Sequence, residues 1–214
     1  MVAGGSGSRF GGPKQFLPLA GRSVAAWSVA AARGVADGVV LVVPSPEGTT
    51  GPTFDGADAG ADRVVTGGTS RAASVRAGLA AVPADADVVV IHDAARPLAQ
   101  PWLFSAVVAA LDADGVDGAI PVLAVSDTLK RVADGTVQAT VDRNGLVTVQ
   151  TPQAFAAAAL RAAHAGESDA TDDAGLLEAL GATVRTVPGD PRNLKLTRPE
   201  DLAIAEALIG PVTR

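Results

Sequence analysis

The first residues that could do chemistry form a glycine-rich segment, AGGSGSRFGGPKQ, at residues 3–15. The segment holds five glycines together with Arg9 and Lys14. Glycine lets the backbone approach a polyphosphate closely and point successive N–H groups at it, and the two cations add positive charge. The segment therefore indicates a loop that binds the phosphates of a nucleotide, with an ordinary surface loop as the alternative.

Three kinds of phosphate loop can be compared with this segment. A Walker A loop requires Gly-Lys followed by Ser or Thr, whereas Lys14 follows Pro13 and precedes Gln15. A Rossmann loop requires glycines at GxGxxG spacing and an acidic residue about twenty positions later, and neither the spacing nor the cations fit. The third kind is the nucleotidyltransferase loop, in which GxGxR is followed by Pro-Lys, and this segment contains both parts.

A second chemical segment, IHDAARP, occupies residues 91–97 at the end of an apolar run. Ligands bind at the carboxyl ends of strands in open α/β sheets. There, Asp93 can bind a ribose hydroxyl or a metal-bound phosphate, and Arg96 can hold an anion through two hydrogen bonds. The alternative is an Asp–Arg pair that caps a strand end. We interpret His92 as a residue that packs or hydrogen-bonds locally, not as a base.

Strands and helices must alternate to position these segments. Apolar runs at 38–44, 87–93 and 118–125 are typical of buried strands. Apolar residues three and four positions apart predict helices over 70–82 and 101–111. The later elements are a helix near 155–165, another near 172–180, a strand near 183–187 and a helix over 198–209. This alternation predicts an α/β fold with a doubly wound, mostly parallel sheet.

Residues 127–149 break the alternation. The segments LKRVA and TVQATV flank Asp134 and Gly135, a pair that tolerates the positive φ angles of a tight hairpin. The sequence therefore predicts an antiparallel β-arm that projects from the α/β body. Two strands alone are marginally stable in water, so we expect the arm to pack on something.

Composition limits the classes to which the protein can belong. Its 214 residues, 48% of them hydrophobic, suffice for one α/β domain, and we expect a single domain over residues 1–214. The lack of cysteine excludes disulfides and Cys-ligated zinc, and His92 and His164 lie too far apart in sequence to indicate a His-rich metal cluster. The net charge of −6 argues against nonspecific binding to nucleic acid or to a membrane. Neither an export signal nor an apolar run of about 18 residues occurs, so we expect a cytoplasmic protein.

Seven further motifs follow one another in a fixed order along the chain. They are GGTSRAASVRAGL at 67–79, HDAARP at 92–97, SDTLK at 126–130, VDRNGL at 141–146, TPQAF at 151–155, TDDAGLLEALG at 171–181 and KLTRPEDLAIAEALI at 195–209. In this order they resemble the methylerythritol phosphate cytidylyltransferases, from Ala3 to Ile209. The resemblance implies a Rossmann-like nucleotidyltransferase fold and transfer of CMP from CTP to 2-C-methyl-D-erythritol 4-phosphate, with release of pyrophosphate, in the non-mevalonate isoprenoid pathway. It also implies Mg²⁺ as cofactor and a homodimer in which the arm reaches into the neighbouring subunit's site.

The resemblance also implies residue roles. The cations that would stabilise the growing charge on the α-phosphoryl group and on the leaving pyrophosphate are Arg9, Lys14 and Lys195. The positions that would bind the nucleotide are Ala3, Gly4, Gly5, Gly7, Gly68, Thr69, Ser74 and Asp93, and Asp93 would also lie near the metal. The positions that would bind the acceptor are Arg96, Thr128, Arg143 and Thr171. Lys130 receives no role, and Asp172 and Asp173 are interpreted as the acidic start of a helix.

Three other functions remain for comparison. Ribitol 5-phosphate cytidylyltransferases share the chemistry and a similar fold, and the shape of the pocket around Arg96, Thr128 and Thr171 would distinguish the two acceptors. A noncatalytic nucleotide-binding module would be expected to lose phosphate-binding cations, yet all three are present. A Rossmann oxidoreductase is disfavoured by the spacing of the glycine loop and by the arm.

The start of the chain departs from the family pattern. Relatives place several apolar strand residues before the glycine loop, whereas only Met1 and Val2 precede Ala3. In doubly wound sheets the strand that feeds this loop is usually central. We therefore expect the central strand to be missing here and the natural start to lie upstream.

Overall fold

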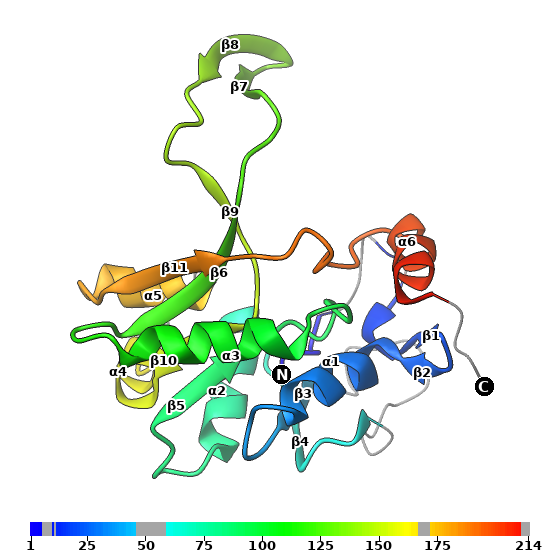
Figure 1. Ribbon diagram of the computed structural model, residues 1–214, viewed down its shortest axis with the longest axis vertical. Coiled ribbons are helices and arrows are strands. Elements are labelled where there is room, and N and C mark those ends of the chain that lie inside the picture. Colours follow the sequence, from blue (N-terminus) through cyan, green and yellow to red (C-terminus); the bar gives the residue numbers. More distant parts are fainter. Residues whose placement is uncertain (6–9, 11, 46–58, 167–171, 211–214) are drawn as a thin grey trace.

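The computed structural model describes residues 1–5, 10, 12–45, 59–166 and 172–210 (Figure 1). The strands of the body are β1 (Pro18–Leu19), β2 (Arg22–Ser23), β3 (Val40–Val43), β4 (Arg63–Thr66), β5 (Val88–Ile91), β6 (Gly118–Ala124), β9 (Val147–Val149), β10 (Gln153–Ala156) and β11 (Val184–Pro188). The α-helices are α1 (Val24–Arg33), α2 (Arg71–Ala81), α3 (Pro101–Ala109), α4 (Ala157–Ala163), α5 (Asp173–Ala179) and α6 (Glu200–Ile209). Short 3-10 helices are η1 (Lys14–Phe16) and η4 (Ala110–Asp112). Within the described ranges, no helix has both the length and the apolar character needed to cross a membrane.

A mostly parallel sheet runs through the body. β3 and β4 pair in parallel on one side, and the strands on the other side follow the order β11-β6-β10-β5. Val2 connects the two groups, because it forms parallel bridges to Val42 of β3 and to Asp93 just after β5. β11 is parallel to β6, whereas β10 is antiparallel to both of its neighbours. The predicted α/β fold with a mostly parallel sheet is therefore confirmed.

Backbone hydrogen bonds hold residues 1–3 in the middle of this sheet. Val2 donates its N–H to the carbonyl of His92 at 2.8 Å, and on the other side Val42 donates to the carbonyl of Met1 at 2.9 Å. The prediction that the central strand is missing is therefore wrong in this respect. A short segment pairs on both sides and leads directly into the glycine loop.

Helices cover both faces of the sheet, as predicted for a doubly wound fold. On one face, α1 and α3 bury Val29 and Phe104 in a cluster with residues of β3. On the other face, α2, α4 and α5 bury Leu79, Leu160 and Leu177 against residues of β5, β6 and β10. Residues of β3, β5, β6 and β10 are therefore buried between the two layers of helices.

The arm leaves the body after β6 and returns before β10 (Figure 1). Its hairpin pairs β7 (Leu129–Ala133) with β8 (Thr136–Val141). The turn between them has φ angles of 49° at Asp134 and 73° at Gly135, which those residue types accommodate. β9 then pairs antiparallel with β6. The predicted projecting antiparallel arm is therefore confirmed.

One strand differs from the prediction of a single helix near 155–165. Gln153–Ala156 form β10, which lies between β5 and β6, and α4 begins only at Ala157. A strand of four residues is too short to show an alternating pattern that would separate it from the helix after it. The sequence patterns also leave α1 and β4 unassigned.

The close packing of β6 on β10 can be tested. A Cβ atom added at Gly118 would lie 2.7 Å from Cδ1 of Phe155, whose side chain is fully buried. We expect Gly118→Ala to lower the free energy of unfolding by about 1–3 kcal/mol, as in other overpacked cores. Urea unfolding measures this, with Gly38→Ala as the control, because the nearest atom to a Cβ there is Asp62 Oδ2 at 3.9 Å. An unchanged unfolding midpoint for Gly118→Ala would contradict the packing.

Candidate functional site

The glycine loop, the start of α2 and the turn after β5 meet where β3 and β5 end, which is the edge that binds ligands in open α/β sheets. Glycine is required here for close approach. A Cβ at Gly4 would lie 3.0 Å from Ser74 Oγ, and one at Gly68 would lie 2.4 Å from Ala73 Cβ. The two glycine-containing segments therefore pack directly on the first turns of α2.

Two polar side chains fasten these segments. Nε2 of the buried Gln15 donates to the carbonyls of Ala3 at 2.5 Å and Gly5 at 3.0 Å. Ser74 is also buried, and its hydroxyl donates to the carbonyl of Ser70 at 2.9 Å. Because that proton is already donated to Ser70, the Ser74 hydroxyl can act toward a bound nucleobase only as a hydrogen-bond acceptor. Gln15 was not assigned a role from the sequence.

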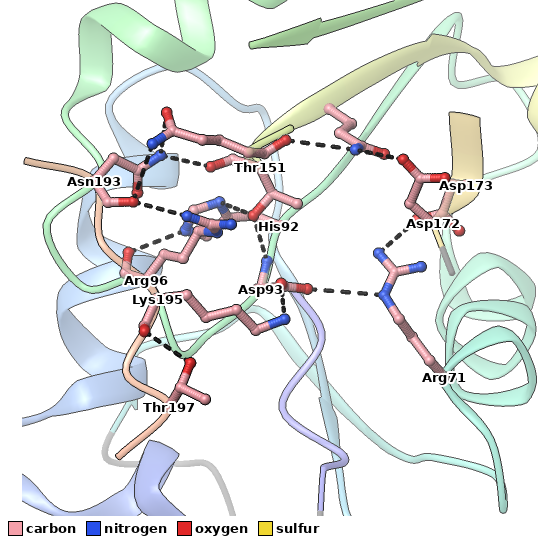
Figure 2. Close-up of polar contacts among 12 residues, drawn as sticks. Arg71, His92, Asp93, Arg96, Thr151, Asp172, Asp173, Asn193, Lys195 and Thr197 are labelled. Carbon is pink, nitrogen blue, oxygen red and sulfur yellow. Dashed lines mark hydrogen bonds and ion pairs between the residues drawn. The ribbon is translucent and has the colours of Figure 1, made fainter. Parts of the chain in front are cut away.

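Asp93 is the charged centre of the site (Figure 2). Its carboxylate lies 2.6 Å from Nζ of Lys195 and 3.9 Å from Nε of Arg71. Burial alone would raise the pKa of Asp93, but the Lys195 and Arg71 cations outweigh burial and hold that pKa below its usual range. Asp93 is therefore an anion at neutral pH. Lys195 is the most exposed of the three, with 45% of its side chain accessible.

Arg71 belongs to this site although the sequence analysis gave it no role. It is the first residue of α2, and its Nη2 lies 2.7 Å from Oδ2 of Asp173. A cation at a helix N-terminus opposes the helix dipole, and this is the signal that could have identified Arg71. Asp172 does cap α5 as expected, accepting from Gly175 N at 3.1 Å. Asp173 lies in the first turn of α5, as predicted, and its side chain turns inward and is fully buried.

His92 helps to hold the backbone of Asp93 through the hydroxyl of Thr151. Its Nε2 lies 3.3 Å from the carbonyl of Arg96, and its Nδ1 lies 3.1 Å from Oγ1 of Thr151. A carbonyl can only accept, so Nε2 carries the proton, and Nδ1 accepts the Thr151 hydroxyl proton. The Thr151 oxygen in turn accepts the N–H of Asp93 at 3.0 Å. Burial lowers the pKa of His92 to about 3, which leaves a neutral ring with a local hydrogen-bonding role, as predicted.

Asn193 ties the loop that carries Lys195 to this turn. Its side-chain Nδ2 donates to the carbonyl of Thr151 at 2.8 Å, and its main-chain carbonyl accepts from Nη1 of Arg96 at 2.8 Å. Gln150 braces the same loop by donating to the carbonyl of Asp190 at 2.9 Å. Burial lowers the pKa of Arg96, but its guanidinium remains positively charged at neutral pH. Arg96 and Lys195 are thus brought together with Asp93, as the resemblance implies.

Gly7, Arg9 and Thr171 fall outside the described residues. Lys14 opens η1, and its Nζ lies 6.0 Å from the centre of the Phe10 ring. On the arm, Thr128 is exposed just before β7.

The second arm residue assigned to the acceptor is Arg143. It donates from Nη1 to the carbonyl of Ser126, so within one subunit its partner is the arm itself. Lys130 donates to Oγ1 of Thr140 at 2.6 Å on the exposed hairpin, which agrees with the absence of an assigned role.

A magnesium ion fits the donor set that this site supplies. Among the residues described, no group of three His, Cys, Asp or Glu side chains converges on one point. Asp93 would therefore contribute a single anionic carboxylate. Mg²⁺ commonly binds through one or two carboxylates together with substrate phosphates and water, so one carboxylate beside a phosphate-binding loop is sufficient.

Comparison with known sequences identifies close relatives. The chain matches the family IspD, 2-C-methyl-D-erythritol 4-phosphate cytidylyltransferase, over residues 1–211. It is 46% identical to the enzyme of that name from Nocardia farcinica, over 98% of this chain and 92% of that protein. The Deinococcus radiodurans enzyme is 48% identical, over 99% of this chain and 89% of that protein. The chain is 44% identical to the bifunctional enzyme IspD/IspF of Clavibacter michiganensis, but it spans only 53% of that protein, or about half the length of such bifunctional relatives.

Solved structures of similar fold have related names. The 2-C-methyl-D-erythritol 4-phosphate cytidylyltransferase from Thermus thermophilus superposes with a TM-score of 0.81 at 35% identity, over 97% of this chain and 96% of that chain. The bifunctional IspDF from Campylobacter jejuni gives a TM-score of 0.79 at 26% identity, over 95% of this chain and 52% of that chain. Sequence and fold therefore point to the same family along nearly the whole chain.

The neutral state of His92 predicts a pH effect on stability. Its pKa is about 3 when folded and about 6.5 when unfolded, so between these values the unfolded chain binds the extra proton. The free energy of unfolding should therefore fall with decreasing pH below about 6.5, by about 1.4 kcal/mol per pH unit. Urea unfolding between about pH 6.5 and 5, above most carboxylate titrations, measures this slope. His92→Gln can reach the same partners without titrating and should lose this part of the slope, and equal slopes in both proteins would show that His92 is not responsible.

Proposed function

The chain belongs to the IspD family of 2-C-methyl-D-erythritol 4-phosphate cytidylyltransferases, and from this premise we propose that its site transfers CMP from CTP to 2-C-methyl-D-erythritol 4-phosphate. An oxygen of the acceptor phosphate forms a bond to the α-phosphorus of CTP. The bond from that phosphorus to the β-phosphate oxygen breaks, and pyrophosphate leaves. The product enters the non-mevalonate route to isoprenoid precursors.

The observation that carries this proposal is the ion pair of Asp93 and Lys195 beside the glycine loop. It places an anion and a half-exposed cation 2.6 Å apart at the carboxyl end of β5. No side chain needs to act as a general base, because a phosphate monoester is largely ionised near neutral pH, with a second pKa of about 6. The neutral, buried His92 is consistent with that requirement.

Three cations serve the nucleotide in this proposal. Arg9, Lys14 and Lys195 bind the phosphates and stabilise the charge that develops on the α-phosphoryl group and on pyrophosphate. Asp93 would hold Mg²⁺ or the ribose, and the ion would neutralise phosphate charge. The base lies against Gly68, Thr69 and Ser74. Gly68 is exposed where it packs against α2, so its backbone groups are open to the polar edge of cytosine, which supports this placement.

The acceptor side is assigned to Arg96, Thr128, Arg143 and Thr171. Arg96 is fixed by Asn193 next to Asp93, which supports its role at the acceptor phosphate. The relatives named above act, by their names, on 2-C-methyl-D-erythritol 4-phosphate, and this favours that acceptor over ribitol 5-phosphate. A pyrophosphate-release assay that crosses CTP, UTP and ATP with both polyol phosphates tests the choice. Preference for ribitol 5-phosphate or for another nucleotide would overturn it.

We also infer a homodimer whose arms complete each other's sites. The arm projects away from the body, and its hairpin exposes Val132 and Val137 by 56% and 58% (Figure 1). A two-stranded hairpin with exposed apolar residues needs a surface to pack on, and a second copy of the chain supplies one. Thr128 and Arg143 would thereby enter the partner's site. The cytoplasmic location remains a prediction.

The lysine roles predict a large loss of activity. Lys14→Ala and Lys195→Ala should each lower turnover by at least about a hundredfold, because loss of one transition-state contact costs roughly 3 kcal/mol. Steady-state pyrophosphate release at saturating CTP measures the effect. The matched control is Lys130→Ala on the exposed hairpin, which should stay within about twofold of wild type. Near wild-type turnover in either site variant would remove that lysine from the mechanism.

The shared site predicts complementation between inactive parents. Arg143→Ala damages the arm and Lys14→Ala damages the phosphate site, so a mixed dimer would contain one site with both halves intact. Activity should reappear after subunit exchange and rise with the fraction of mixed dimers, measured by native mass spectrometry. Proven mixed dimers without activity would refute the shared site.

A further inference from the structure

Arg71 occupies a position whose charge needs an explanation. It follows the N-cap Ser70 at the start of α2, where the helix dipole disfavours a cation. Its guanidinium lies between two carboxylates, 2.7 Å from Asp173 and 3.9 Å from Asp93 (Figure 2). The pairing is unequal: the ion pair with Asp173 is close, whereas the contact with Asp93 is long.

Asp173 is built to hold that guanidinium. Its side chain is only 1% exposed, and its second oxygen hydrogen-bonds to Nε2 of His164 at 3.0 Å. Burial alone would raise the pKa of Asp173, but the His164 hydrogen bond and the Arg71 charge keep that pKa low. A buried carboxylate kept charged in this way fixes its partner, because separating the two would leave a charge buried without compensation.

The unequal pairing bears on Asp93. Lys195 already contacts this carboxylate at 2.6 Å, and it is the more exposed and adjustable of its two cations. If Arg71 also bound Asp93 closely, or stood beside it without a counter-charge, two positive charges would oppose a divalent cation there. Asp173 compensates the charge of Arg71 and holds its guanidinium 3.9 Å from Asp93, too far for a close ion pair.

We propose that Asp173 is a positioning residue for the reaction: it neutralises Arg71 and holds it beside Asp93, which leaves the Asp93 carboxylate available to Mg²⁺. This inference rests on the proposed function, in which Asp93 serves the metal. Arg71 is the intermediary, and His164 keeps Asp173 in place from within the core.

The test compares three substitutions in the full chain. Asp173→Asn keeps the shape but leaves Arg71 uncompensated, so the Mg²⁺ concentration for half-maximal turnover should rise at least about fivefold, or about 1 kcal/mol. Arg71→Gln leaves the negative charge of Asp173 uncompensated and should lower the Mg²⁺ concentration for half-maximal turnover. Arg71→Gln combined with Asp173→Asn removes both charges and should return the requirement to within about twofold of wild type. Electron paramagnetic resonance of Mn²⁺ with CTP and no acceptor should give the same order without turnover.

The controls separate this role from stability and from the proposed function. Arg161→Gln removes hydrogen bonds to backbone carbonyls around the end of α2, so it should lower the melting temperature without changing the Mg²⁺ requirement. If Asp173→Asn also lowers only the melting temperature, or if the double substitution does not restore Mn²⁺ affinity, the inference is wrong. Should Asp173→Asn fail to fold, Arg71→Gln decides alone by whether the requirement falls. Asp93→Asn with unaltered Mg²⁺ dependence would instead refute the proposed metal role of Asp93.

Discussion

A carboxylate buried at the end of a central strand requires compensation, and the site is organised around meeting that requirement for Asp93. Transfer of an isolated charge out of water is very costly, so such a group persists as an anion only among cations and hydrogen-bond donors. Lys195 and Arg71 supply this compensation to the Asp93 carboxylate, and the backbone N–H of Asp93 donates to the Thr151 hydroxyl oxygen. Each of these partners comes from a different part of the chain.

The partners of Asp93 are in turn held by buried groups behind them. Asn193 links the Lys195 loop to Thr151, His92 links Thr151 to the turn of Arg96, and Asp173 restrains Arg71 from within the core. These links are buried hydrogen bonds and ion pairs, which are expensive to break because the remaining partner would be left unsatisfied. These buried contacts fix the positions of Asp93, Lys195 and Arg71 relative to one another.

The arm differs from this buried site because it is exposed. It supplies predicted acceptor contacts from an exposed hairpin, which in one subunit is held by its own turn and by pairing of β9 with β6. The same family module occurs alone in some relatives and joined to a second enzyme in others, of which this chain spans about half. In our proposal the body alone binds the nucleotide, whereas binding of the acceptor also requires the arm of the second subunit.

The sequence by itself determined the parts that rest on local patterns. Apolar runs located β3, β5 and β6, the Asp134–Gly135 pair located the arm, and the ordered motifs identified the family. Only the tertiary structure decided which distant groups meet. Val2 completes the sheet through pairing on both sides, β10 inserts between β5 and β6, and Arg71 joins Asp93 to Asp173. No periodicity or motif reports these contacts, because they depend on backbone pairing and charge compensation between segments tens of residues apart, whereas periodicity records only which face of one element is buried.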